Sequence, residues 1–170
     1  MSRLIYFAYG SNMARARLAA RIRDIRHAGL ARLPAHRLSF EQRSEHDGSG
    51  KCDASATGHP DDHVIGVLWD IPAEEIHVLD RFEGPGYRRV SLWLQHEHTH
   101  ICGEIYLARE RFSDVHPWHW YKHHVLAGAR ENQLPNDYIQ TIERIPELND
   151  PDPERSAREL AIYQFSSAPA

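Results

Sequence analysis

Residues 6–13, YFAYGSNM, contain the point at which an apolar run breaks into Gly-Ser-Asn. Residues 4–9 are rich in aromatic and branched side chains, which favour a β-strand, whereas the residues that follow are typical of turns and helix starts. Two interpretations remain open. The turn is an ordinary helix start with Ser11 or Asn12 as N-cap, or its backbone N–H groups hold a carboxylate or a developing oxyanion.

Working outward from this strand, the rest of the chain alternates between strand-like and helix-like segments. Strand patterns continue at residues 35–42, 52–58, 63–72, 87–95 and 100–108. Helical spacing of apolar residues occurs at residues 13–25, 72–82, 117–132 and 134–145. Because short loops join most neighbouring strands, antiparallel pairing is expected. The pattern predicts an α+β fold with a strongly curved sheet that can close into a small barrel.

The length and composition are those of one globular domain. The 170 residues are 41% hydrophobic and 26% charged, and we find no spacer that would divide them. We therefore expect a single domain over residues 1–170, in which residues 149–170 form a C-terminal tail. We also expect that the exposed helices could support a weak homodimer.

The charge and the N-terminal sequence exclude several classes of partner. Lys and Arg total 20 against 24 Asp and Glu, a formal charge of −4, so no overall basic field favours nucleic acid. The start of the chain fits neither a signal peptide nor a membrane span. Cys52 and Cys102 are far apart in sequence and are expected to be unpaired thiols. We therefore expect a cytoplasmic protein without a nucleic-acid or membrane partner.

Glu83, within LDRFEGPGY at residues 79–87, is the most unusual carboxylate of the chain. It ends a predicted amphipathic helix, follows Phe82, and enters a turn whose Gly84 and Gly86 permit close approach to a ligand. Such surroundings could raise its pKa and make it a general base. The alternative is a surface glutamate before an ordinary turn.

Three separated motifs resemble, in order, the signatures of the gamma-glutamylcyclotransferase family. They are YFAYGSNM at 6–13, VIGVLWDIP and LDRFEGPGY between 64 and 87, and YKHHVLAGARENQLPNDY at 121–138. The resemblance extends over about residues 4–145. It implies a small mixed, mostly antiparallel β-barrel flanked by helices, and an enzyme that converts gamma-glutamyl compounds to 5-oxoproline and a free amine or amino acid.

The resemblance also assigns residues to roles. Glu83 occupies the position of the catalytic glutamate. The positions implied for substrate binding are Tyr6, Phe7, Ala8, Tyr9, Gly10, Ser11, Asn12 and, less securely matched, Tyr121.

The chemistry of ring closure fits these roles. The α-ammonium of the substrate must lose a proton before it attacks its own γ-carbonyl, so a base of raised pKa is required, and Glu83 suits that task. Because nucleophile and carbonyl belong to one molecule, the reaction gains a large effective molarity. Neither a metal nor any other cofactor is needed, and a gamma-glutamyl compound is the expected partner.

The leaving group stays open. Arg88 and Arg89 follow the GPG turn and alternate across a strand, so only one can face the site, where it would favour an acidic leaving group. The alternative is a solvated arginine on the surface of the strand. The alternatives are a gamma-glutamyl amino acid, another gamma-glutamyl conjugate such as a gamma-glutamyl amine, and a binding module of the same fold that lacks turnover. A binding module would not require a base at Glu83.

The 13 histidines raise a metal hypothesis. His96, His98 and His100 alternate at a hairpin tip, and His119 and His123 stand one helical turn apart, a spacing that can hold zinc. Backbone alternation is lost at such a tip, and no carboxylate or thiolate completes the helical pair. We therefore expect solvated or packing histidines and no metal site. The nearby Trp118 and Trp120 are likewise expected to form core or pocket wall.

Overall fold

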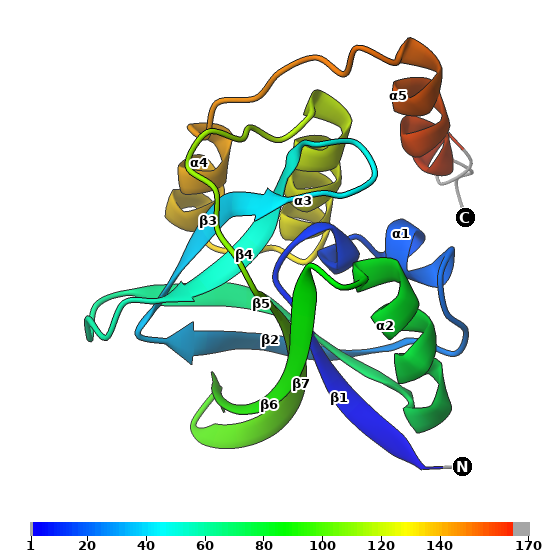
Figure 1. The fold of residues 1–170 in the computed structure, drawn as a ribbon. Coiled ribbons are helices and arrows are strands. Elements are labelled where there is room, and N and C mark those ends of the chain that lie inside the picture. The colour runs from blue at the N-terminus through cyan, green and yellow to red at the C-terminus, as the bar shows by residue number, and fades with distance from the viewer. Residues whose placement is uncertain (1, 165–170) are drawn as a thin grey trace.

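The computed structural model describes residues 2–164, which contain seven strands and five α-helices (Figure 1). The strands are β1 (Arg3–Ala8), β2 (Arg26–Pro34), β3 (His36–Arg43), β4 (Gly50–Ala56), β5 (His63–Pro72), β6 (Tyr87–His96) and β7 (Thr99–Ala108). The helices are α1 (Arg15–Ala19), α2 (Ile76–Glu83), α3 (His119–Glu131), α4 (Asn136–Glu143) and α5 (Pro153–Leu160), with 3-10 turns η1 (Ser11–Met13), η2 (Ala73–Glu75) and η3 (Ala161–Tyr163).

Five strands close into a barrel in the order β1-β5-β2-β6-β7. All neighbours pair antiparallel except β1 and β7, which pair in parallel at Tyr6 and Glu104. Strand β5 lies between β1 and β2, and almost all of its residues are buried, as its continuous apolar sequence indicates. The predicted α+β fold with a small mixed barrel is thus confirmed.

Strands β3 and β4 form a separate antiparallel ribbon outside the barrel. Figure 1 shows this ribbon between the barrel and helices α3 and α4, while α1 and α2 lie together on the right of the view. Helix α3 packs against η1 so closely that a Cβ added to Gly128 would lie 2.3 Å from the Ala14 nitrogen. The turn after β1 is therefore held between the barrel and α3.

The structure corrects the sequence prediction in two places. Strand β2 is absent from the predicted set because a bulge between His27 and Leu30, with Gly29 at φ 106°, interrupts the alternation of buried residues. Within the predicted tail, residues 153–160 form helix α5, which buries no residue completely. Ion pairs hold it instead, including Arg155 with Asp150 and Glu159 with Arg17.

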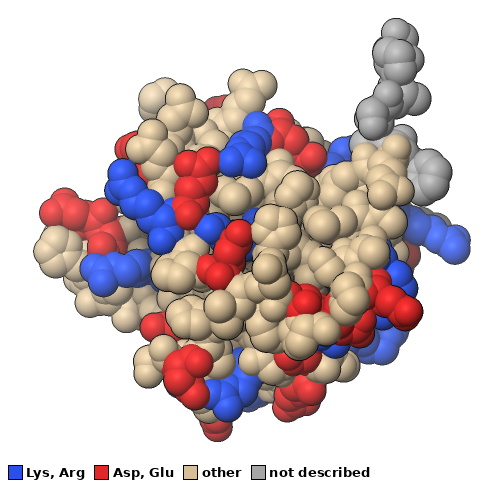
Figure 2. Space-filling view, turned by 90° about the horizontal axis from the view of Figure 1, so that it is seen from above, with Lys and Arg blue, Asp and Glu red and all other residues tan. Residues whose placement is uncertain are grey.

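Several surface features bear on the expected partners. On the face seen in Figure 2, basic and acidic side chains are interspersed. Within residues 2–164, no helix is both long and apolar enough to cross a membrane. Cys52 and Cys102 are unpaired, as expected, with Cys52 buried and Cys102 exposed.

Candidate active site

The turn after β1 is a 3-10 turn that uses its polar side chains for tertiary contacts. Ser11 Oγ accepts a hydrogen bond from Arg17 Nε at 3.1 Å, and Asn12 Nδ2 donates to Tyr6 Oη at 2.9 Å and Glu83 Oε1 at 3.2 Å. Neither side chain caps a helix, and Gly10 stands at the cap position. The prediction of Ser11 or Asn12 as N-cap was therefore wrong, because both side chains have partners elsewhere.

The main chain of this turn is packed closely and leaves donors available. A Cβ added to Gly10 would lie 3.0 Å from Cys52 Cβ and 3.4 Å from Tyr121 Oη, so a larger residue there would displace its neighbours. Trp69 Nε1 in β5 donates to the Asn12 carbonyl at 3.1 Å and ties the turn to the barrel. Within residues 2–164, the N–H groups of Gly10, Ser11 and Asn12 find no acceptor.

Helix α2 brings Glu83 to this turn. Ile76 and Leu79 are buried on its inner face, and the helix ends at Gly84, whose φ of 65° favours glycine. Glu83 is the last residue of the helix, and its side chain is 18% exposed. The carboxylate thus faces Asn12 of the first motif across 71 positions of sequence.

Two opposing effects set the basicity of Glu83. Burial raises the pKa of Glu83, while the charges of Arg21 and Arg17 and the hydrogen bond from Asn12 offset part of this rise. Arg21 Nη1 lies 3.6 Å from Glu83 Oε1 and also donates to Asn12 Oδ1 at 3.0 Å. The result is a carboxylate of raised pKa that is held in place by a cation and an amide, as a general base requires.

Tyrosines complete the wall around the turn. The Tyr121 hydroxyl accepts from the Cys52 N–H at 3.0 Å, and the Tyr87 hydroxyl donates to the Cys52 carbonyl at 2.6 Å. These two bonds fix the β4 backbone beside Gly10. Tyr9 Oη donates to the Tyr106 carbonyl and joins β1 to β7.

These side chains line a small cavity of about 30 Å³ that shares four lining residues with a larger one. The small cavity is lined by Tyr6, Tyr9, Gly10, Ser11, Asn12, Cys52, Glu83, Tyr87, Tyr106 and Tyr121. The larger cavity, of about 530 Å³, shares Ser11, Glu83, Tyr87 and Tyr121 with it and extends outward to α1, α5 and the loop between β3 and β4. Glu83 stands where the two meet.

The structure brings most of the predicted residues together, but not all of them. Phe7 and Ala8 are fully buried in β1 and line neither cavity. Of the two alternatives for Arg88 and Arg89, the structure favours the solvated one, because neither side chain lines a cavity. Arg88 is exposed, and Arg89 Nε lies 3.4 Å from Asp80 and 3.6 Å from Glu104, away from both cavities.

The histidines take other roles. Within the described residues, no group of three or more His, Cys, Asp or Glu side chains is arranged to hold a metal ion. His96 Nδ1 lies 2.7 Å from the Leu30 carbonyl, and His119 Nδ1 lies 2.9 Å from Glu147 Oε1. Trp120 lines the larger cavity, which agrees with its expected place in a pocket wall.

Arg17 and Arg21 are site residues that the sequence reasoning missed. They stand four positions apart directly after the turn, so they share one face of a helical segment. Arg17 contacts Ser11, and Arg21 contacts Asn12 and Glu83. This spacing is the one sequence signal for the pair, and it does not show which groups the two arginines contact.

The fold and site define a small-barrel protein in which a buried carboxylate faces a turn of free peptide N–H groups. Residues 63–142 match the model of the AIG2-like family. The chain is 30% identical to human gamma-glutamylcyclotransferase, over 86% of this chain and 80% of that protein, and 29% identical to the bovine enzyme over the same shares. The chain belongs to the gamma-glutamylcyclotransferase family.

Solved structures agree with this assignment. A structure of a gamma-glutamyl cyclotransferase superposes with a TM-score of 0.83 at 25% identity, and the match covers 96% of this chain and 99% of the other. A human protein described as uncharacterised superposes with a TM-score of 0.79 at 28% identity, over 87% of this chain and 90% of the other. Both share the barrel and its flanking helices.

Proposed function

We propose that the protein converts gamma-glutamyl amino acids to 5-oxoproline and the free amino acid, with Glu83 as the proton-transfer residue. The observation that carries the proposal is the buried Glu83 carboxylate 3.2 Å from Asn12 Nδ2, beside the free N–H groups of residues 10–12. Family membership supports the same reaction, and a net charge of −4, which gives no basic field for nucleic acid, fits a small-molecule substrate.

The residues suggest the following sequence of proton transfers. Glu83 accepts a proton from the substrate α-ammonium, and the freed amine attacks the γ-carbonyl carbon to form the five-membered ring. The N–H groups of Gly10 and Ser11 stabilise either the carbonyl oxygen, as it gains negative charge, or the substrate α-carboxylate. Glu83 then returns this proton to the leaving nitrogen as the old amide bond breaks, and the second proton that the ring nitrogen loses also passes to the leaving amine, which departs as an ammonium, so no metal is required.

The test is the substitution Glu83→Gln, which keeps the shape of the side chain but cannot accept the proton. We expect 5-oxoproline formation from a gamma-glutamyl amino acid to fall by roughly a hundredfold or more. Binding of 5-oxoproline and the circular dichroism spectrum should change little. Glu74→Gln, at an exposed position in the turn before the same helix, is the matched control and should retain full activity.

Mass spectrometry of the product gives the readout, with one arm in EDTA. Undiminished turnover by the Glu83→Gln protein would refute the proposed role. Loss of activity in EDTA that Zn²⁺ restores would contradict metal-independent ring closure. Ligand binding by the unmodified protein without any turnover would favour the binding-module alternative.

A further inference from the structure

The small cavity cannot hold a whole gamma-glutamyl amino acid. Its volume of about 30 Å³ is room for roughly two water molecules. This inference rests on the proposed function, which places the reacting carbonyl beside Glu83. The leaving group then extends into the cavity of about 530 Å³. The residues of that larger cavity therefore decide which leaving groups are accepted.

The walls of the larger cavity carry more positive than negative side chains. The cations are Arg17, Arg21, Lys51, Arg81, Arg155 and Arg158. The anions are Glu45, Asp47, Glu83 and Glu159. This excess of positive charge favours a leaving group that bears a carboxylate over one that bears an ammonium.

Most of these cations are already engaged in other contacts or are exposed to solvent. Arg17 and Arg21 hold the turn after β1, as described above. Arg155 is bound to Asp150 through two hydrogen bonds, at 2.7 and 2.5 Å. The Arg158 side chain is 67% exposed at the rim, and Arg81 is exposed as well. Lys51 is likewise paired, with Asp47, but its side chain is only 14% exposed and lies over the ring of Tyr121, which lines both cavities.

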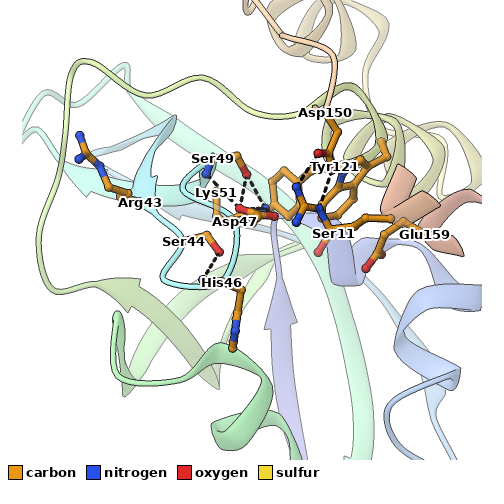
Figure 3. Close-up of polar contacts among 12 residues, drawn as sticks. Ser11, Arg43, Ser44, His46, Asp47, Ser49, Lys51, Tyr121, Asp150 and Glu159 are labelled. Carbon is orange, nitrogen blue, oxygen red and sulfur yellow. Dashed lines mark hydrogen bonds and ion pairs between the residues drawn. The ribbon is translucent and has the colours of Figure 1, made fainter. Parts of the chain in front are cut away.

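Lys51 lines the larger cavity and is held there by its neighbours. Its side chain is 14% exposed, and Nζ lies 4.5 Å from the Trp120 ring centroid and 4.6 Å from that of Tyr121. Tyr121 lines both cavities, and its hydroxyl holds the next residue of β4, Cys52. Figure 3 shows Lys51 with Ser49 and Asp47 beside Tyr121, whereas Arg43 points away from them.

The ammonium of Lys51 keeps one donor free. Nζ contacts both oxygens of the Asp47 carboxylate, Oδ2 at 2.9 Å and Oδ1 at 3.3 Å, which a single shared N–H can bridge, and it donates a second N–H to Ser49 Oγ at 2.6 Å. Burial lowers the pKa of Lys51, and the Asp47 carboxylate opposes that effect. The third N–H is available to an anion inside the cavity.

We propose that Lys51 binds the α-carboxylate of the leaving amino acid and is the residue that selects gamma-glutamyl amino acids over gamma-glutamyl amines. In such a substrate three bonds separate the scissile carbonyl carbon from the carboxylate carbon, a span of roughly 4 Å. Lys51 Nζ lies 4.6 Å from the centroid of the Tyr121 ring, and Tyr121 lines both cavities, so a leaving group that passes from the small cavity into the larger one along this ring approaches Lys51. A carboxylate placed there accepts the third N–H of the Lys51 ammonium.

The test uses two substrates that differ only in this carboxylate, gamma-glutamyl-alanine and the γ-ethylamide of glutamate. The variant is Lys51→Met combined with Asp47→Asn, because Lys51→Met alone would leave the buried Asp47 unpaired. We expect kcat/KM for gamma-glutamyl-alanine to fall on the order of tenfold to a hundredfold, mainly through KM. Turnover of the ethylamide should change less than about threefold, within the variation of neutral substitutions.

Two further variants separate a direct contact from a general field. Arg158→Met removes a positive charge from the same rim and should leave the ratio of the two kcat/KM values unchanged. Lys51→Arg keeps the charge and should retain the preference for the alanine compound. Equal losses for both substrates in the double variant, or an equal effect of Arg158→Met, would overturn the assignment of Lys51.

Failure of the proposed function has a different signature. If the unmodified protein forms 5-oxoproline from neither substrate, the cyclotransferase proposal itself is wrong. If it forms 5-oxoproline and the double variant keeps the unmodified ratio, only the role of Lys51 is refuted.

Discussion

We predict that the protein loses stability as the pH falls, because the ring of His124 in helix α3 is completely buried and is not easily protonated there. Its Nδ1 lies 2.6 Å from the Tyr163 hydroxyl, and its Nε2 lies 3.1 Å from Glu159 and 3.0 Å from Arg17. Burial lowers the pKa of His124 from 6.5 to about 4. The folded protein therefore holds a neutral ring at a pH where the unfolded chain has already bound a proton.

The sign and size of the effect follow from this difference. Between pH 6.5 and pH 4 the unfolded state binds more protons at this site than the folded state, so the free energy of unfolding falls as the pH falls. The stabilisation is fully present above pH 6.5 and is lost progressively down to pH 4. A shift of this size corresponds to about 3 kcal/mol.

Urea denaturation at several pH values between 7 and 4 measures this contribution, with His124→Gln as the reference. Glutamine keeps polar atoms at the position but does not titrate in this range. We expect the stability of the unmodified protein to decrease by about 3 kcal/mol more than that of the variant. Parallel curves for the two proteins would refute the assignment of a depressed pKa to His124.

Two further substitutions test the packing of the site. Gly128→Ala places a Cβ 2.3 Å from the Ala14 nitrogen, so we expect lower stability in thermal melting and weaker 5-oxoproline binding in calorimetry. Unchanged values would contradict the close contact. Tyr121→Phe leaves the buried Cys52 N–H without its acceptor, which should cost about 1–3 kcal/mol of unfolding free energy in urea. A Tyr121→Phe protein as stable as the original would show that another acceptor replaces the hydroxyl.

Local patterns were sufficient to predict those elements whose buried faces repeat regularly. Strand β5 and the β6–β7 hairpin follow from their apolar sequences, and Leu94 is fully buried in β6. Strand β2 could not be found in this way, because the bulge at Gly29 shifts its pairing. Helix α5 was missed because it has no buried apolar stripe and depends on ion pairs with distant residues.

The site was predictable only where motif and turn chemistry coincide. Glu83 and the Gly10-Ser11-Asn12 turn were identified from their neighbours in sequence, and the structure places them in contact. Arg17 and Arg21 act through tertiary contacts that no local pattern contains. The same holds for Lys51. In the sequence it directly follows a run of polar loop residues, whereas in the structure it lies over the rings of Trp120 and Tyr121.

The two parts of the site have different structural origins, and this difference has a consequence for specificity. Glu83 and the turn after β1 are fixed by the barrel and by α2, whose buried residues belong to one hydrophobic core. Part of the wall of the larger cavity comes from the ribbon of β3 and β4 with its loop, and from α5, which lie outside the barrel. Because loop changes cost little stability when they do not disturb a core, the leaving-group preference can change without altering the proton-transfer machinery. Substitutions at Asp47 or Lys51 should therefore alter which gamma-glutamyl compound is cleaved, whereas those at Asn12 should lower the rate for every substrate.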